Sequence, residues 1–346
     1  MSSFKNISGK TILITGNTGF KGSWLTFFLK HLGCKIYGIS DEDYEGIYNL
    51  SKTKDLLEKQ YYFDLTTISS KEIESLLKEV KPDIVFHFAA QSLVKRAALE
   101  PVKTIEINSL ATIKLLVAVN NCPSIELVTI ATTDKVYAIP ENLNKEEDSL
   151  FGTEFYSASK VAAENFISAF NNTFKREDLK VATIRSGNVV GGGDRGEARI
   201  IPDIINAIYK NANLEIRNPG YIRPWTYVLD SLSGYLAASN YCIENNKNEI
   251  FNLNSETDNN HDVMFVLNTF LKLCDFNYKI TEQINPEFKE VETLIIKSSK
   301  AKELLDWDSK FKLDTVIEKI YNWENYHQKQ QDSQYSFQEV EEFLSK

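Results

Sequence analysis

The sequence predicts an α/β fold in which a doubly wound parallel sheet is followed by a smaller mixed α/β domain. Short β-branched apolar runs alternate with helix-forming segments, and a glycine-rich turn separates the first run from the first helix. Such alternation is typical of strands that are joined by crossover helices and pair in parallel. We expect the first domain to span residues 1–185 and the second to span 186–335, with residues 224–242 returning a helix to the first domain.

The composition is that of a soluble globular protein and argues against several kinds of partner. Hydrophobic residues make up 42% and charged residues 25% of the 346 positions, enough for a sizeable core. The net charge of −9 argues against a basic face that neutralises nucleic-acid phosphates. The N-terminus lacks the apolar core of a signal peptide, and no apolar run is long enough to span a bilayer. We expect no nucleic-acid partner and no membrane partner.

The cysteine spacing bears on metal and redox sites, and one segment of biased composition bears on flexibility. The four cysteines match neither a metal site nor a redox motif; they are Cys34, Cys122, Cys242 and Cys274. We expect them to be reduced and buried in a cytoplasmic protein without a metal site. The Gln-rich segment 327–334 is expected to be a flexible linker to a short last helix.

The first strand and helix enclose a glycine-rich loop. Residues 10–15 form a β-rich run, the sequence Gly-Asn-Thr-Gly-Phe-Lys-Gly follows at 16–22, and an apolar helix continues over 23–29. Glycines at these positions permit a tight turn and let backbone N–H groups approach a pyrophosphate at the helix start. A plain strand-to-helix turn is the alternative. The loop predicts the dinucleotide site of a Rossmann domain, with contacts from Gly16, Asn17, Thr18, Gly19, Phe20 and Gly22.

The second strand, over residues 34–39, ends in Ser40 and Asp41. An acidic residue about 20 positions after the glycines holds the ribose 2′-hydroxyl in such domains. Asp41 fits that role, and Ser40 is the alternative contact. Because no arginine stands there to hold a 2′-phosphate, we expect the cofactor to be NAD rather than NADP.

The alternation continues with strands at 61–65, 82–90 and 125–131 and a helix at 104–119. In open parallel sheets, ligands bind beyond the carboxyl ends of the strands, so one crevice should collect residues from several of them. His87, inside an apolar strand, is expected to be a core histidine. The remaining predicted cofactor contacts are Asp64, Leu65, Ala89, Ala90, Gln91, Asn108 and Lys160.

The segment from Ala131 to Lys160 carries the groups suited to chemistry. Thr133 lies where the strand at 125–131 ends, and Tyr156 and Lys160 lie four apart on one helical face. A nearby ammonium favours the phenolate, so the tyrosine pKa is expected to fall from its usual value of about 10. A phenolate could take a proton from a hydroxyl while hydride leaves the same carbon. A chance surface pair is the alternative.

These motifs together resemble the extended short-chain dehydrogenase/reductase superfamily, which acts on nucleotide sugars. Residues 15–25, 89–94, 133–137 and 185–194 resemble the CDP-glucose 4,6-dehydratases in particular, and residues 201–203, 216–219 and 222–225 extend the likeness. The resemblance covers about residues 8–240, and more weakly continues to about 325.

The resemblance implies a mechanism for these residues. Tyr156, helped by Thr133 and Lys160, takes the proton of the sugar 4-hydroxyl while hydride passes from C4 to NAD. Lys135 then removes the C5 proton, and Asp134 protonates the departing 6-hydroxyl. Hydride returns to C6 and leaves a 4-keto-6-deoxy sugar. Which of Asp134 and Lys135 moves which proton stays open.

The resemblance also implies a substrate site in the second half of the chain. It places Asn188 and Arg223 at the nucleotide diphosphate, and arginine suits phosphate through bidentate hydrogen bonds. Gln91 is a further candidate for the substrate. Arg199 and Arg217 are expected either to add to this site or to form surface salt bridges. The glycine run 191–193 is expected to be a mobile loop over the substrate.

Several positions depart from the CDP-glucose branch and leave the base and the sugar open. Arg195 replaces a tryptophan, Tyr227 replaces a histidine, and segments 253–258 and 288–292 differ. A 4-epimerase, a dehydratase for another nucleotide sugar and a non-catalytic NAD-binding regulator are the alternatives. The Asp-Lys pair argues against an epimerase. The family implies a homodimer or higher homo-oligomer, formed through helices near 104–119 and 156–170.

Overall fold

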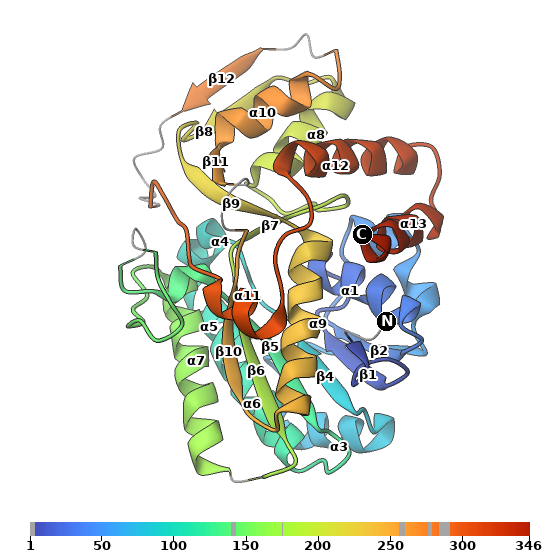
Figure 1. The fold of residues 1–346 in the computed structure, drawn as a ribbon, viewed down its shortest axis with the longest axis vertical. Coiled ribbons are helices and arrows are strands. Elements are labelled where there is room, and N and C mark those ends of the chain that lie inside the picture. Colours follow the sequence, from blue (N-terminus) through green and yellow to red (C-terminus); the bar gives the residue numbers. More distant parts are fainter. Residues whose placement is uncertain (1–3, 140–142, 175, 256–259, 276–278, 284–290) are drawn as a thin grey trace.

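A seven-stranded parallel sheet organises the structure (Figure 1). The computed structural model describes all residues except 1–3, 140–142, 175, 256–259, 276–278 and 284–290. The strand order is β10-β6-β5-β4-β1-β2-β3, and every neighbouring pair is parallel. The strands are β1 Thr11–Thr15, β2 Lys35–Ser40, β3 Lys59–Tyr62, β4 Ile84–His87, β5 Leu127–Thr133, β6 Lys180–Ser186 and β10 Glu249–Leu253. The predicted doubly wound parallel sheet is therefore confirmed.

Helices cover both faces of this sheet because alternate strand residues point to opposite sides. Ile12 and Ile14 pack into the core cluster that includes α1 (Phe20–His31) and α9 (Val228–Glu244). Leu13, between them, packs into a second cluster. That second cluster is covered by α3 (Ser70–Val80), α6 (Ala111–Asn120) and α7 (Phe155–Thr173). In Figure 1, α9 and α1 lie on one side of the sheet and α6 and α7 on the other.

The helix expected at 104–119 is longer and less regular than predicted. It runs from α5 (Pro101–Ile105) through a π-helical turn, η3 (Glu106–Leu110), into α6. Such turns insert one residue into a helix and are frequent at functional sites. The other helical segments are α2 Ile47–Leu50, η2 Thr53–Leu56, α4 Val94–Leu99, η4 Asp134–Val136, α8 Ile200–Lys210, α10 Val263–Leu271, α11 Ser299–Leu305, α12 Leu313–His327 and α13 Gln334–Ser345. Among the described helices, none is both long and apolar enough to cross a membrane.

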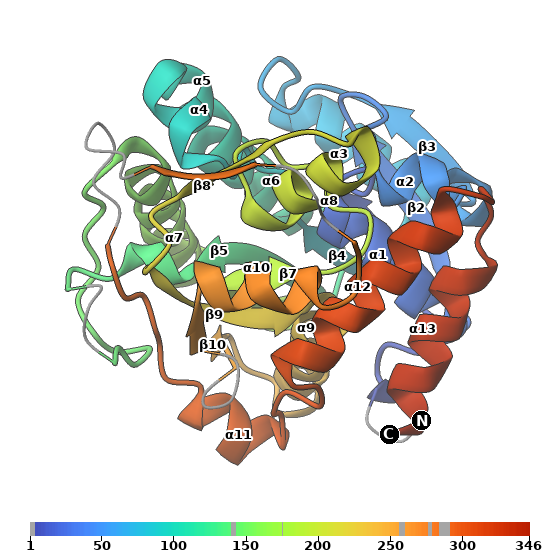
Figure 2. The same ribbon diagram turned by 90° about the horizontal axis from the view of Figure 1, so that it is seen from above.

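Two small sheets lie beyond the carboxyl ends of the large one (Figure 2). One contains β11 (Asn260–Asp262), β9 (Ile222–Tyr227) and β7 (Asn188–Val190), and the other pairs β12 (Ile280–Gln283) with β8 (Leu214–Arg217). The domain boundary near residue 185 stays a prediction. Two later elements belong to the large sheet: α9 packs on it where a returning helix was expected, and β10 extends its edge. The sequence analysis did not predict β10, because its five residues carry no clear period.

The C-terminal helix packs into the core instead of trailing from it. Phe343 of α13 contacts Phe28 of α1, with ring centroids 5.9 Å apart. The preceding Gln-rich stretch is a turn in which the Tyr326 hydroxyl donates to the Asp332 carboxylate at 3.0 Å. Asp332 also lies 3.3 Å, through its backbone oxygen, from His327 Nε2. The expected short last helix is present, and the expected flexible linker is a hydrogen-bonded turn.

The glycine run 191–193 is a packing element, so the prediction of a mobile loop was wrong. All three glycines are buried, and a Cβ atom on Gly192 would collide with Trp323 of α12. The Gly193 amide donates to Glu324 at 2.9 Å, and Arg195 forms an ion pair with the same carboxylate at 2.7 Å. This segment is therefore fixed to α12 and has no room for larger side chains.

Gly192→Ala should destabilise the protein by about 1–3 kcal/mol, because the added methyl group overpacks the contact with Trp323. Gly220→Ala is the matched control, since a Cβ there meets nothing within 4 Å. The free energy of unfolding in urea measures both. Equal stability of the two variants would show that the run tolerates side chains.

Candidate active site

A cleft of about 1400 Å³ opens at the carboxyl ends of the large sheet, below the small sheets. Its walls include Gly16 after β1, Ala89 after β4, Thr133 at the end of β5 and Ser186 at the end of β6. Parallel register brings these ends together, because Thr15 pairs with His87 and Thr133 with Ser186. The predicted convergence of strand ends on one crevice is what the structure shows.

The glycine loop approaches the neighbouring backbone too closely for side chains. Gly16 has φ of +72°, and a Cβ there would lie 2.6 Å from the Ala89 amide nitrogen. A Cβ on Gly22 would lie 2.7 Å from the Asn17 Cα. Helix α1 then begins after Gly19 without a side-chain cap. Gly16, Gly19, Phe20 and Gly22 all line the cleft, so the positive end of this helix faces it.

Asn17 and Thr18 support the loop instead of lining the cleft. The Asn17 side-chain nitrogen donates to Gln60 Oε1 at 2.6 Å. Thr18 Oγ1 lies 2.6 Å from Ser40 Oγ and donates to the Glu42 backbone oxygen at 2.8 Å. Both side chains are buried. These hydrogen bonds connect the glycine loop to the region of β2 and β3. Neither Asn17 nor Thr18 lines the cleft.

Four other predicted cofactor residues line the same end of the cleft: Ser40, Asp41, Asp64 and Leu65. The Asp41 carboxylate accepts from the Glu42 amide at 3.1 Å and the Tyr44 hydroxyl at 3.1 Å. Asp64 accepts from the amide and hydroxyl of Thr66 at 2.8 and 2.7 Å. Local hydrogen bonds therefore fix both carboxylates at the rim that follows β2 and β3.

The five predicted catalytic residues all line the cleft. Thr133 Oγ1 donates to Asp134 Oδ1 at 3.1 Å, and Lys135 Nζ lies 3.6 Å from that oxygen. Asp134 is 1% exposed, and its second oxygen has no hydrogen-bond partner among the described residues. Lys160 Nζ donates to the Ala131 backbone oxygen at 3.0 Å. Tyr156 lies beside Thr133, whose hydroxyl is within hydrogen-bonding reach. An acid, a base and a phenol are thus assembled in one place.

Burial controls the protonation of the tyrosine and lysine. It raises the pKa of Tyr156 to about 12, and the neighbouring Thr133 hydroxyl opposes that effect. It lowers the pKa of Lys160 to about 8, and the Glu164 carboxylate opposes that effect. The prediction that Lys160 lowers the pKa of Tyr156 was wrong, because that pKa is raised and Lys160 is not among its causes. Helical spacing places the two residues on one face, but the ammonium is hydrogen-bonded to Ala131 and burial of the phenol prevails.

Asn108 lies in the π-helical turn and positions other residues. Its side chain accepts from the Gln91 amide and donates to the Gln91 backbone oxygen, both at 2.9 Å. It also donates to Ser159 Oγ at 2.9 Å, next to Lys160. Asn108 does not line the cleft, whereas Gln91 does. Gln91 in turn donates to Thr104 of α5 at 3.0 Å, so its side chain is already engaged with that helix.

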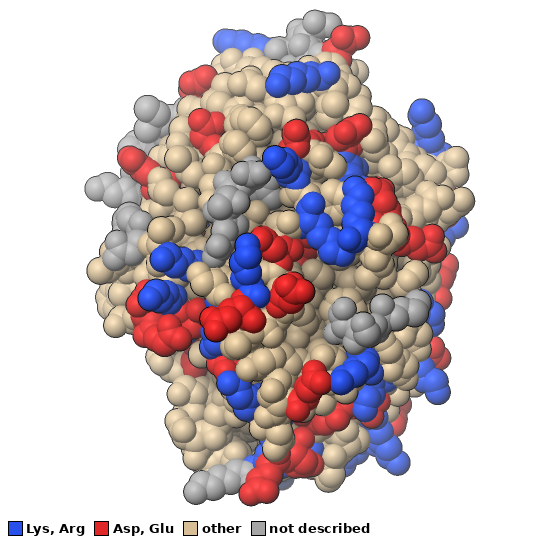
Figure 3. Space-filling view, viewed as in Figure 1, with Lys and Arg blue, Asp and Glu red and all other residues tan. Residues whose placement is uncertain are grey.

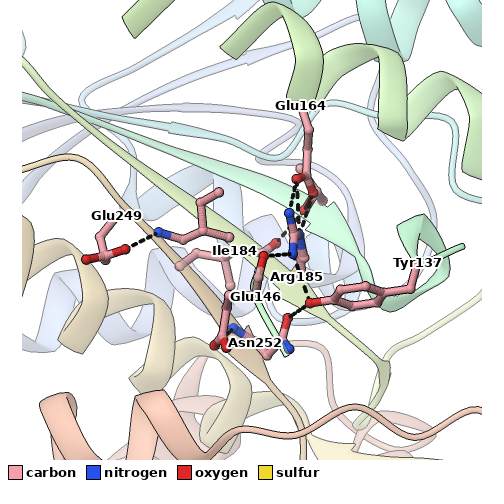
Figure 4. A network of polar contacts seen from close by, with 9 residues as sticks. Tyr137, Glu146, Glu164, Ile184, Arg185, Glu249 and Asn252 are labelled. Carbon is pink, nitrogen blue, oxygen red and sulfur yellow. Dashed lines mark hydrogen bonds and ion pairs between the residues drawn. The ribbon is translucent and has the colours of Figure 1, made fainter. Parts of the chain in front are cut away.

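A buried polar network behind the cleft was not predicted (Figure 4). Arg185 of β6 forms an ion pair with Glu164 of α7 at 2.6 Å and donates to the Tyr137 hydroxyl at 2.9 Å. Glu164 also accepts from Thr132 at 2.8 Å, one residue before Thr133. Tyr137 donates to Asn252 of β10 at 2.6 Å. No sequence motif marks these contacts, since the partners come from distant segments.

The substrate candidates Asn188, Arg199, Arg217 and Arg223 also line the cleft. Arg199 pairs with Asp194 at 3.1 Å and donates to Ser92 at 2.9 Å. Arg217 pairs with Asp203 at 3.1 Å, so it forms a salt bridge and still faces the cleft. Arg223 is 6% exposed and donates to the Ile222 backbone oxygen at 2.9 Å.

Two of the sequence departures contact the C-terminal helices, and Arg195 also lines the cleft. Arg195 pairs with Glu324 of α12, as described above, and the Tyr227 hydroxyl donates to Glu339 of α13 at 2.7 Å. Tyr227 does not line the cleft. Residues 256–258 and 288–290 of the other two segments lie outside the described residues.

Lys21 is one of the cleft residues that the sequence did not indicate. Lys21, in the glycine loop, lines the cleft, and burial lowers its pKa to about 7. Its Nζ donates to the Tyr235 hydroxyl at 3.3 Å. The sequence signal that could have identified Lys21 is that it is the charged residue of the glycine-rich segment 16–22.

Sequence comparisons show which known proteins this chain resembles. The family model described as GDP-mannose 4,6 dehydratase matches residues 13–320. A CDP-glucose 4,6-dehydratase of Salmonella typhimurium is 33% identical over 329 residues, covering 91% of this chain and 90% of that protein. A UDP-glucose 4-epimerase of Lactobacillus helveticus is 26% identical over 339 residues, covering 92% of this chain and 98% of that protein.

Solved structures share the fold. The epimerase Mth375 of Methanothermobacter thermautotrophicus matches with a TM-score of 0.82 and 21% identity, over 95% of this chain and 96% of that one. A UDP-glucose-4-epimerase of Stenotrophomonas maltophila, with bound NAD and formylated UDP-arabinopyranose, matches with a TM-score of 0.80 and 18% identity, over 92% and 99%. The match of the family model over most of the chain, together with the 33% identity, shows that the protein belongs to the GDP-mannose 4,6 dehydratase family.

Proposed function

We propose that the protein is an NAD-dependent nucleotide-sugar 4,6-dehydratase that converts CDP-glucose to CDP-4-keto-6-deoxyglucose with loss of water. One observation carries this proposal: Asp134 and Lys135 lie 3.6 Å apart in the cleft that also contains Tyr156. Elimination of water needs a base for the C5 proton and an acid for the departing hydroxyl. The similarity to a CDP-glucose 4,6-dehydratase supports the nucleotide and sugar.

The residues of the cleft fit NAD. The contact between Gly16 and Ala89 leaves a cradle that any side chain would fill, at the N-terminal end of α1. Backbone N–H groups there suit a pyrophosphate, and Asp41 suits a ribose hydroxyl. Bound NAD would accept the hydride of the sugar C4 and return it to C6. A structural neighbour whose title names bound NAD supports this choice.

The chain's own residues would move the protons. Tyr156, beside Thr133, would take the proton of the 4-hydroxyl, and the positive charge of Arg199 opposes the effects of burial and of Asp134 on its pKa. Lys135, whose side chain is 25% exposed and lies 3.6 Å from Asp134, would take the C5 proton. Asp134 is buried beside it and suits the leaving hydroxyl. The opposite division of these two roles remains compatible with the geometry.

A 4-epimerase is the second candidate, because the matching proteins include UDP-glucose 4-epimerases. An epimerase oxidises C4 and returns hydride to the same carbon, so it needs no acid and base for elimination. In an epimerase, the buried Asp134 and the adjacent Lys135 would have no role in the reaction. This pair therefore favours the dehydratase.

The surface and the cysteines fit the proposed partners and compartment. Figure 3 shows acidic and basic side chains interspersed on one face, without a continuous basic track. Three of the four cysteines are buried, and all four are free thiols. We propose a cytoplasmic enzyme whose partners are small molecules and further copies of the chain.

Incubation with CDP-, dTDP-, UDP- and GDP-glucose, followed by mass spectrometry, should show loss of one water from CDP-glucose without added oxidant or reductant. Lys135→Met should still oxidise C4 but stop before water leaves, so NADH absorbance should appear and persist. Tyr156→Phe is the matched control, which should lose about 10²–10⁴-fold in turnover without accumulating NADH. An intact sugar nucleotide with inverted C4 would contradict the dehydratase.

We propose a homodimer formed by the outer faces of the helices expected near 104–119 and 156–170, extended at their N-terminal ends by α4 and α5. Large apolar side chains are exposed there, among them Leu99 at 71%, Val102 at 69% and Phe155 at 48%. Such faces on neighbouring helices suit a helix-bundle interface between two copies.

Val102→Asp combined with Leu99→Asp should convert the dimer into a monomer of 39.5 kDa, as measured by sedimentation. Leu304→Asp is the control, because Leu304 is an exposed apolar residue on the distant α11. A wild-type protein that sediments as a monomer would contradict the proposed interface.

A further inference from the structure

Asp134, Gly187 and Asn254 lie side by side beyond the carboxyl ends of the large sheet. Each directly follows one of three neighbouring strands, β5, β6 and β10, whose last residues pair in parallel register. A Cβ on Gly187, the middle residue, would lie 2.8 Å from Asn254 Oδ1 and 3.0 Å from Asp134 Oδ2. The two oxygens therefore face one point. Asn254 belongs to segment 253–258, which departs from the CDP-glucose branch, so the resemblance does not imply this contact.

These two oxygens are buried acceptors without a donor. Within the described residues, neither has a hydrogen-bond partner, and neither is accessible to a water molecule. Buried polar atoms are nearly always paired. An ionised carboxylate and an amide oxygen can only accept, so they cannot satisfy each other. A proton on Asp134 Oδ2 resolves this, because a carboxylic acid can donate to the amide oxygen of Asn254.

The other contacts of the two side chains are consistent with a proton on that oxygen. Asp134 Oδ1 accepts from Thr133 at 3.1 Å and lies 3.6 Å from Lys135 Nζ, so the donors gather on the opposite side of the carboxyl group. Asn254 Nδ2 donates to the Ile296 backbone oxygen at 3.4 Å, which leaves Oδ1 as the atom that faces Asp134.

The charges that face Asp134 favour its carboxylate form. Lys135 of η4 and Lys21 of α1 attract the negative charge, and the phenol of Tyr156 on α7 is also within range of it. The amide oxygen of Asn254 acts in the opposite direction, since it repels an anion and accepts from the neutral acid. Asn254 is therefore placed to retain a proton that the two lysines would otherwise displace.

We propose that Asn254 is a positioning residue, whose amide oxygen retains the proton of Asp134 and so makes Asp134, and not Lys135, the acid for loss of water. This inference rests on the proposed function, because it assumes that a hydroxyl leaves the sugar in this cleft. Asp134 lines the cleft, and rotation about its Cβ–Cγ bond exchanges the two oxygens, which brings the proton to the substrate.

The protons of this step balance. The bond from C6 to oxygen breaks, the departing oxygen takes the carboxyl proton and leaves as water, and Asp134 becomes a carboxylate. Lys135 takes the C5 proton and returns a proton to C5 when hydride reaches C6. Tyr156 has gained the proton of the 4-hydroxyl, so exchange with solvent between Tyr156 and Asp134 restores the resting state.

The test is the rate of each partial reaction of the NAD-loaded enzyme with CDP-glucose at pH 6 and pH 8. Absorbance of NADH reports oxidation of C4, and mass spectrometry reports loss of water. In Asn254→Leu, C4 should still be oxidised, but loss of water at pH 8 should slow about ten-fold, the effect of one hydrogen bond, and NADH should accumulate. The deficit should shrink at pH 6, where solvent keeps the carboxyl group protonated.

Two further variants separate the oxygen from the fold. Asn254→Asp also lacks the nitrogen that donates to Ile296, but it keeps an oxygen toward Asp134, and two carboxyl groups that share a site hold one proton between them. It should lose water several-fold faster than Asn254→Leu at pH 8. Asn245→Leu removes an exposed asparagine that follows α9 outside the cleft, and it should leave every rate unchanged. Thermal unfolding of each variant verifies that the fold is intact.

The possible failures are distinguishable. If Asn254→Leu loses water at the wild-type rate at both pH values, or slows C4 oxidation by the same factor as water loss, the inference is wrong and the dehydratase stands. If Asn254→Asp is slower than Asn254→Leu, the amide nitrogen faces the carboxylate, which also overturns it. If the wild type releases no water from any sugar nucleotide, the proposed function is wrong, and the inference goes with it.

Discussion

The close approach of the glycine loop to the end of β4 is the constraint on which the rest of the site depends. Gly16 adopts φ of +72°, and its α-carbon faces the Ala89 backbone so closely that a Cβ would lie 2.6 Å from the amide nitrogen. This contact holds the start of α1 beside the end of β4. The parallel register of the sheet places the ends of β5 and β6 at the same edge. Backbone donors on one side and Thr133 on the other then face a single cleft.

The sequence predicted those parts of the structure that local pattern determines. The strand–loop–helix at the glycines and the helical spacing of Tyr156 and Lys160 each depend on residues within a few positions of one another. The three loop glycines, Tyr156 and Lys160 line the cleft. Strand β10 could not be found in this way, because it is defined by pairing with β6. The same holds for the pair of Arg185 and Glu164, which joins a strand to a helix behind the site.

The errors have the same physical origin. Spacing places Lys160 beside Tyr156, but it does not reveal that the ammonium is bonded to Ala131 or that burial raises the phenol's pKa. The run of three glycines has the composition of a mobile loop, yet Trp323 covers it. Arg195 and Tyr227, which depart from the CDP-glucose branch, contact helices α12 and α13. These two contacts hold the C-terminal helices, and Arg195 also lines the cleft.

The proposed dehydration requires that hydride leave one carbon of the sugar and return to another within the same turnover. CDP-glucose deuterated at C4 tests this when the label is followed by mass spectrometry and NMR. Deuterium should appear at C6 of the same molecule, while solvent hydrogen enters at C5. Deuterium that returns to C4, or that leaves the protein as labelled NADH, would contradict it.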